Sequence, residues 1–152
     1  DPANADPVLK ESTRLLCAGA FATQSTYDIC QWDDIIGLPK DKSPEEILAI
    51  GRAFGIKSAT RDEIYHLSEI RAELDFLGKM DRTSPPIFVF NKQAAVVPTN
   101  QDELHHHPYH ARALKEKAEK VGIEAVVYAP EIGIIDPSGK DLVEFFLDKF
   151  YN

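Results

Sequence analysis

The sequence of 152 residues has little cysteine, no excess of basic charge and no long apolar run. Two cysteines do not make a disulfide framework, and a metal site built on them would need more ligands at closer spacing. Only 17 basic residues stand against 25 acidic ones, so the net charge is −8. A nucleic-acid-binding surface needs a basic face, and a membrane-spanning helix needs about 18 apolar residues in a row. We therefore expect neither nucleic acid nor a membrane as a partner.

What is present fits one globular domain. The chain is 43% hydrophobic and 28% charged, which are ordinary values for a globular protein. Its length is that of one domain, and it contains no internal repeat. We expect a single domain over residues 1–152, and nothing in the composition calls for a cofactor.

Three short apolar segments are candidates for strands. Residues 14–22 are apolar after the first residue, and residues 87–90 and 123–129 form two more apolar runs. Such runs are typical of parallel strands that helices cover on both faces. Helix is the competing interpretation of residues 14–22, because leucine and alanine favour it. Strand is the better prediction, since residues 23–28 then form the start of a loop, which we expect to extend over 23–42.

Helical patterns separate these strands. Residues 108–121 and 139–151 carry apolar residues at helical spacing after the second and the third strand. Residues 43–55 and 60–78 give two more helices, each with a glycine at its end. Three of the helices begin with a serine or threonine followed three residues later by an acid. These pairs are Ser43 with Glu46, Thr60 with Glu63, and Ser138 with Asp141. The order of elements predicts an α/β fold, a parallel sheet with flanking helices.

Residues 84–98 carry a resemblance to a known family. Ser84-Pro85-Pro86 precedes the strand at 87–90, and Val96-Val97-Pro98 follows after a short loop. This segment resembles the strand and acid loop of α/β-hydrolases of the esterase and lipase-like branch, where the loop reads Gly-x-x-Asp and then Val-Pro. Residues 114–124 are similar to the next helix and strand of that family, and residues 6–14 resemble the lead-in to an earlier strand. The resemblance implies the second half of a hydrolase fold, with a helical cap insertion at about 40–80.

The same resemblance implies a function related to carboxylic-ester hydrolysis, but the hydrolytic groups are missing at their expected positions. The chain has no Gly-x-Ser-x-Gly nucleophile elbow, which in the family's order would come before residue 1. Alanine occupies the acid position, at or beside Ala94 and Ala95, and no histidine follows His110. We therefore expect an incomplete or catalytically degenerate hydrolase relative. The alternatives are a non-catalytic binding or assembly module, or a metal-binding protein that uses residues 105–110.

The densest group of potential chemistry is a histidine cluster after the second strand. Its members are His105, His106, His107 and His110. Pro108 suits the first position of a helix, which makes His107 the cap and places His110 in the first turn. The positive end of that helix favours neutral imidazole, the form that a general base or a metal needs. Asp102, His106 and His107 are therefore the candidate catalytic residues. His110 is a candidate ligand-binding residue.

This cluster has three interpretations. Its side chains can be solvated or cap the helix, they can form a substrate pocket or a displaced catalytic group, or they can bind a metal beside Asp102 and Glu103. Its position favours a role in binding, because open parallel sheets bind ligands at the carboxyl ends of their strands. We assign no metal site.

Three residues after the first strand reach the same edge of the predicted sheet. Tyr27, Asp28 and Trp32 are candidate ligand-binding residues. The alternative for Trp32 is a buried side chain that packs in the core or under the cap.

The free edge of the first strand indicates which partners to expect. This edge would be apolar and uncharged, which makes it prone to association. We expect a homo-oligomer, or a missing N-terminal half as the partner that covers this edge. If the protein is active, the resemblance implies a small-molecule ester as its substrate.

Overall fold

The computed structural model describes the chain except residues 1, 11, 13, 39–60 and 152. The helix predicted at residues 43–55 lies outside the described residues. No helix in the described part of the chain combines the length and apolarity that crossing a bilayer requires.

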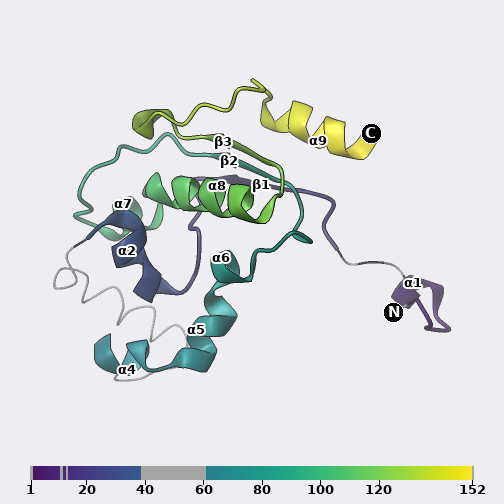
Figure 1. Ribbon diagram of the computed structural model, residues 1–152, viewed down its shortest axis with the longest axis horizontal. Helices are drawn as coiled ribbons and strands as arrows, with labels where there is room; N and C mark the ends of the chain where they lie inside the picture. Colours follow the sequence, from purple (N-terminus) through teal and green to yellow (C-terminus); the bar gives the residue numbers. More distant parts are fainter. Residues whose placement is uncertain (1, 11, 13, 39–60, 152) are drawn as a thin grey trace.

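The three predicted strands form one parallel sheet (Figure 1). They are β1 (Ala18–Phe21), β2 (Ile87–Phe90) and β3 (Ala125–Tyr128), in the spatial order β1-β2-β3. Ala18 lies opposite Ile87, and Ile87 lies opposite Ala125. The α/β class and the strand, rather than helix, in residues 14–22 are thus confirmed. Each strand has only four residues. β1 ends at Phe21, because the next residue, Ala22, has a φ of 45° and leaves the extended region.

One face of the sheet is covered by α8 (Tyr109–Val121). Ala111 and Leu114 pack there against Val89 and Val127 in a buried apolar cluster. Gly122 ends this helix with a φ of 78°, a conformation that glycine adopts without steric strain. The predicted helix at 108–121 is therefore confirmed to within one residue.

The opposite face is covered by α9 (Leu142–Tyr151). Alternation along each strand turns Phe88 and Val126 to this face, where they form a second buried cluster with Phe145. The predicted start of this helix was wrong. The capping pair is Asp141 with Glu144, because the Asp141 carboxylate accepts from the Glu144 N–H and the Glu144 carboxylate accepts from the Asp141 N–H.

The single helix predicted over residues 60–78 is three short helices. They are α4 (Arg61–Tyr65), α5 (Ser68–Leu74) and α6 (Phe76–Lys79). The second break occurs at Asp75, whose carboxylate accepts the Gly78 N–H at 2.7 Å and caps α6. At the first break, the Arg71 guanidinium donates to the Tyr65 carbonyl at 3.0 Å. Side-chain hydrogen bonds to the backbone therefore override the apolar spacing.

Five short helical segments lie in stretches without a predicted element. They are α1 (Pro7–Lys10), η1 (Ile29–Gln31), α2 (Trp32–Ile36), α7 (Gln101–His105) and η2 (Pro130–Ile132). The loop predicted at 23–42 was therefore wrong where η1 and α2 lie. Asn100 caps α7 by accepting the Glu103 N–H at 3.0 Å. Such short segments bury too few periodic apolar residues to be predicted from hydrophobic spacing.

Substitution of Gly19 in β1 tests how α9 packs on the sheet. A Cβ at this position would lie 2.5 Å from Leu142 Cδ1, so a side chain there would force the Leu142 side chain out of its place between α9 and the sheet. We expect Gly19→Val to lower the free energy of unfolding by about 1–3 kcal/mol. The matched control is Ala20→Val, because Ala20 lines a hollow of about 180 Å³ that also involves Leu114 of α8.

Urea unfolding followed by circular dichroism checks this expectation. Ala20→Val should change the free energy of unfolding by less than about 1 kcal/mol. Equal destabilisation by the two variants would contradict the placement of α9 over Gly19.

Candidate functional site

The loops after β1 and β2 meet at the carboxyl ends of the strands, the left-hand edge in Figure 1. Hydrogen bonds join them: His106 Nδ1 bonds to the Ala22 carbonyl, and Ser25 Oγ lies 3.0 Å from His110 Nδ1. Asn91, directly after β2, donates from Nδ2 to the His106 carbonyl at 3.0 Å. The structure thus brings the histidine cluster to the edge at which open parallel sheets bind ligands.

His110 lies at the centre of this junction and is fully buried. Its Nε2 lies 3.2 Å from the Leu104 carbonyl, which can only accept, so Nε2 carries the proton. Nδ1 is then the acceptor for the Ser25 hydroxyl. The Trp32 ring packs edge-on against the imidazole with centroids 5.2 Å apart. Both ring nitrogens are therefore engaged, and one tautomer is selected.

Burial also sets the charge state of His110. It lowers the pKa of the imidazole from 6.5 to about 4, while the hydrogen bond with the Leu104 carbonyl opposes this shift. The ring is neutral at neutral pH, as predicted, although burial rather than the helix end is the main cause. The Ser25–His110 pair has the separation of a nucleophile and its base. Both residues are fully buried and the second nitrogen faces a carbonyl, so the pair has the features of a structural contact.

His107 is buried as well and anchors the loop after β2. Its Nε2 donates to the Val96 carbonyl at 3.1 Å, and its Nδ1 accepts the Tyr109 N–H at 3.3 Å. Burial lowers its pKa, opposed by the bond to Val96. The helix α8 begins at Tyr109, so His107 lies just before the N-cap Pro108 rather than at the cap.

His106 and Asp102 are the two candidate catalytic residues that the structure brings together. His106 Nε2 lies 3.7 Å from Asp102 Oδ1, and both side chains reach solvent. The bond from Nδ1 to the Ala22 carbonyl orients the imidazole and leaves Nε2 facing outward. His107 turns away from this pair to Val96.

The histidine rings face different partners. His105 packs edge-on against Trp32 with centroids 5.3 Å apart, and its buried Nε2 has no hydrogen-bond partner among the described residues. Within the described ranges, no three side chains of histidine, cysteine, aspartate or glutamate are grouped to hold a metal ion.

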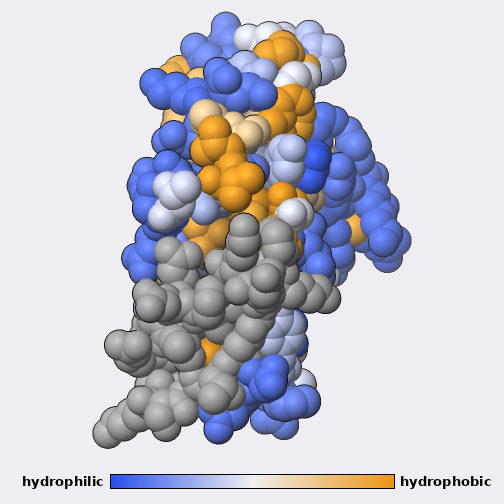
Figure 2. Space-filling view, turned by 90° about the vertical axis from the view of Figure 1, so that its left-hand side faces the viewer, coloured by the Kyte–Doolittle hydropathy of each residue, from blue (hydrophilic) through white to orange (hydrophobic). Residues whose placement is uncertain are grey.

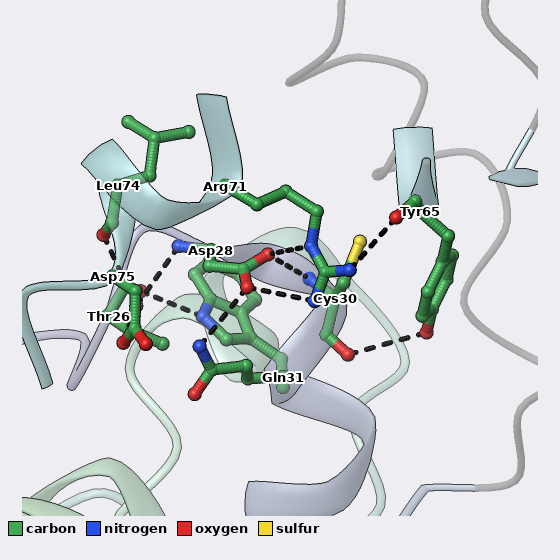
Figure 3. Close-up of polar contacts among 9 residues, drawn as sticks. Thr26, Asp28, Cys30, Gln31, Tyr65, Arg71, Leu74 and Asp75 are labelled. Carbon is green, nitrogen blue, oxygen red and sulfur yellow. Dashed lines mark hydrogen bonds and ion pairs between the residues drawn. The ribbon is translucent and has the colours of Figure 1, made fainter. Parts of the chain in front are cut away.

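Asp28 takes part in a polar network that holds the segment after β1 to α5 (Figure 3). Its carboxylate accepts two hydrogen bonds from the Arg71 guanidinium, at 2.9 and 3.0 Å, and one each from the Cys30 N–H and Gln31 Nε2. The hydrogen bond with Asp28 is the main cause that raises the pKa of Arg71. Only 4% of the Asp28 side chain is exposed. This ion pair therefore holds two parts of the fold together, and Asp28 has little access to a ligand. Sequence reasoning missed Arg71, which lies 43 positions from its partner.

The other two candidates after β1 differ in exposure. Trp32 is buried, and its Nε1 donates to the Thr26 carbonyl at 2.9 Å, which agrees with the alternative of a core side chain. Tyr27 is exposed and packs edge-on against Phe76 with centroids 5.3 Å apart.

The loop that resembles the family's acid loop contains no carboxylate. Asn91 is buried, its Oδ1 accepts the Gln93 N–H at 2.9 Å, and Ala94 and Ala95 are exposed. Figure 2 faces this end of the molecule and shows apolar side chains gathered on it. Val96 and Val97, in the loop after β2, are exposed. A hollow of about 130 Å³ beside them is lined by residues 36–38 and 95–98, His107 and Tyr109.

A larger cavity, of about 500 Å³, lies on the α9 face of the sheet. Its walls are mostly aromatic and apolar: Phe21, Phe88, Phe90, Tyr128, Ile135, Leu142 and Val143, with Asp136, Gly139, Lys140 and Asp141 completing the lining. The hydroxyl of Tyr128 is buried and has no hydrogen-bond partner among the described residues. Sequence reasoning missed this cavity, although aromatic residues two positions apart in β2 were a signal for it.

Comparison with known proteins adds no assignment to this geometry. No family model, no curated protein and no solved structure matches the chain. Any function must therefore be argued from the residues themselves.

The buried imidazole of His110 predicts a pH-dependent stability. Its pKa is about 4 in the folded protein and about 6.5 when unfolded, so below pH 6.5 only the unfolded chain takes up the proton. We expect the free energy of unfolding to fall by about 3 kcal/mol between pH 6.5 and 4. The double variant Ser25→Ala/His110→Phe should lose most of this dependence.

Urea unfolding at a series of pH values measures the effect. His66→Gln, which removes an exposed histidine, is the control and should keep the slope of the parent protein. A double variant with the parent slope would contradict the role assigned to His110.

Proposed function

We propose that this protein is a ligand-binding relative of α/β-hydrolases of the carboxylic-ester type whose described residues do not perform the hydrolysis. The observation that carries the proposal is the aromatic cavity at the carboxyl ends of the strands, whose lining contains no histidine. The nitrogens of His107 and His110 are already bonded elsewhere. The ligand class is a small carboxylic ester with an apolar or aromatic group.

The order and direction of the elements support the relationship. Three parallel strands follow one another in both sequence and space, with helices on both faces of the sheet. Residues 85–98 adopt the sequence of proline pair, strand and loop on which the resemblance rests. This topology is also common to other α/β proteins, so the family relationship remains part of the proposal.

The state of the histidines argues against hydrolysis by these residues alone. A general base needs a free nitrogen within hydrogen-bond reach of its substrate. Both nitrogens of His107 and of His110 are bonded inside the protein, and the family's acid position holds alanine.

The cavity has the size and lining of a small-molecule site. Ligand pockets range from about 300 to 1,000 Å³, with mostly apolar walls and few polar groups, and this one measures about 500 Å³. The Tyr128 ring lines the cavity, while its hydroxyl is buried in the protein and has no partner among the described residues. Aromatic walls from Phe88 and Phe90 suit the apolar part of the ligand.

A second candidate function rests on the His106–Asp102 pair. His106 has one nitrogen fixed by a backbone carbonyl, while the other faces solvent near a carboxylate. This is the arrangement of a base with an orienting group. With a nucleophile from outside the described residues, the pair would serve as a displaced base and acid in ester hydrolysis.

Calorimetric titration with p-nitrophenyl butyrate measures binding, and the release of nitrophenol measures hydrolysis. Together the two measurements separate the two candidate functions. We expect saturable binding and no turnover above the buffer rate. Ile135→Ala, which removes an exposed apolar part of the cavity wall, should weaken binding by about 5- to 10-fold with little effect on stability. Tyr27→Phe changes an exposed tyrosine outside the cavity and should bind as the parent does.

Two outcomes would overturn the leading proposal. Absence of binding would remove the cavity as the ligand site. Turnover that His106→Gln and Asp102→Asn both reduce would replace binding with the displaced catalytic pair.

A further inference from the structure

The outer edge of β1 is unpaired among the described residues. Ala18 and Ala22 donate their N–H groups to the carbonyls of Pro86 and Phe90 in the β2 segment. Because successive peptide groups of a strand point to opposite sides, those of Gly19 and Phe21 point away from β2. In the order β1-β2-β3, the described part of the chain places no strand on that side. The edge therefore offers free donors and acceptors to another strand.

Nothing in the side chains of this edge protects it. Residues 15–22 contain no charge and no proline, the devices that proteins commonly use to block edge pairing. Leu15, Leu16 and Phe21 are 54–67% exposed. An exposed, uncharged and apolar edge is the kind that pairs with another chain.

The helix α9 carries a second apolar stripe on its outer side. Leu142, Phe145 and Phe146 pack toward the sheet. Val143, Leu147 and Phe150 follow one another at positions i, i+4 and i+7 and are 49–62% exposed. A helix at the surface of a monomer normally has a polar outer side. This stripe therefore has the spacing of a helix-packing face.

The edge and the stripe form one surface, called here the β1–α9 surface. A Cβ on Gly19 would contact Leu142 and Phe146, so α9 packs directly on the face of the edge strand. Phe21 of the edge and Val143 of the stripe line the same cavity. A partner that pairs with β1 would therefore also reach α9.

We infer that the β1–α9 surface binds a second copy of this chain in a twofold dimer. The twofold axis would pair β1 with β1 of its partner in antiparallel sense and give a continuous six-stranded sheet. Because α9 runs back across the sheet against the direction of the strands (Figure 1), the same axis sets the two α9 helices antiparallel on one face. Each feature of the surface thus meets its own copy, as a twofold interface requires.

Charge and size favour a second copy as the occupant. Two identical edges repel when they carry charge, and residues 15–22 carry none. A stable interface uses about 20 residues from each partner. The edge segment 15–22 and the outward-facing residues of α9 would form the centre of such an interface. The inference does not depend on the proposed ligand or on hydrolase kinship.

Sedimentation velocity over a wide range of concentration tests the dimer. We expect a species of twice the 17.0 kDa chain mass that becomes monomeric in Phe21→Lys and in Leu147→Lys, with far-UV circular dichroism unchanged. Val97→Lys is the matched control, because Val97 is exposed and apolar but lies in the loop after β2, and this variant should remain dimeric.

A second measurement does not depend on the folding of any variant. In the parent protein, amide hydrogen exchange at Gly19 and Phe21 should slow as the concentration rises into the dimer range. A monomer at all concentrations, a dimer that both lysine variants leave intact, or pairing of β1 only with a different polypeptide would each overturn the inference.

Discussion

The hydrogen-bonded chain from Ser25 through His110 to the Leu104 carbonyl ties the loop after β1 to the loop after β2. The three parallel strands have four residues each and are joined by long connections. Such short strands alone do not fix the positions of those connections. The buried imidazole holds the connections in place, because it accepts from one loop and donates to the other while Trp32 packs on its ring. An unsatisfied nitrogen at this depth would cost about 1–3 kcal/mol, so the junction is held in one arrangement.

This structural use of histidine decides what the end of the sheet can do. His107 fixes the loop at Val96 as His110 fixes the loop at Ser25, and neither keeps a nitrogen for a substrate. His106 is the member of the cluster whose outer nitrogen faces solvent beside a carboxylate. The aromatic cavity on the α9 face, which we propose as the ligand site, has no histidine in its lining. The cavity proposed as the ligand site therefore shares no residue with the His106–Asp102 pair.

The sheet was predictable because continuous apolar runs mark strands that are covered on both faces. The helices α8 and α9 were predictable for a similar reason, since each carries enough periodic apolar residues to identify a buried face. The breaks within residues 60–78 were not, because Asp75 and Arg71 satisfy backbone groups through contacts that spacing does not reveal. The roles of the histidines also depend on distant partners: Ser25 lies 85 positions before His110.

His110 is a neutral, buried residue that is hydrogen-bonded to both loops. Nitrogen-15 NMR of histidine-labelled protein reads its tautomer and charge directly, without unfolding the chain. We expect His110 to remain the Nε2–H tautomer from pH 8 to pH 5, with Nδ1 shifted as a hydrogen-bond acceptor. Protonation of this ring near pH 6.5 in the folded protein, or an Nδ1–H tautomer, would contradict the account.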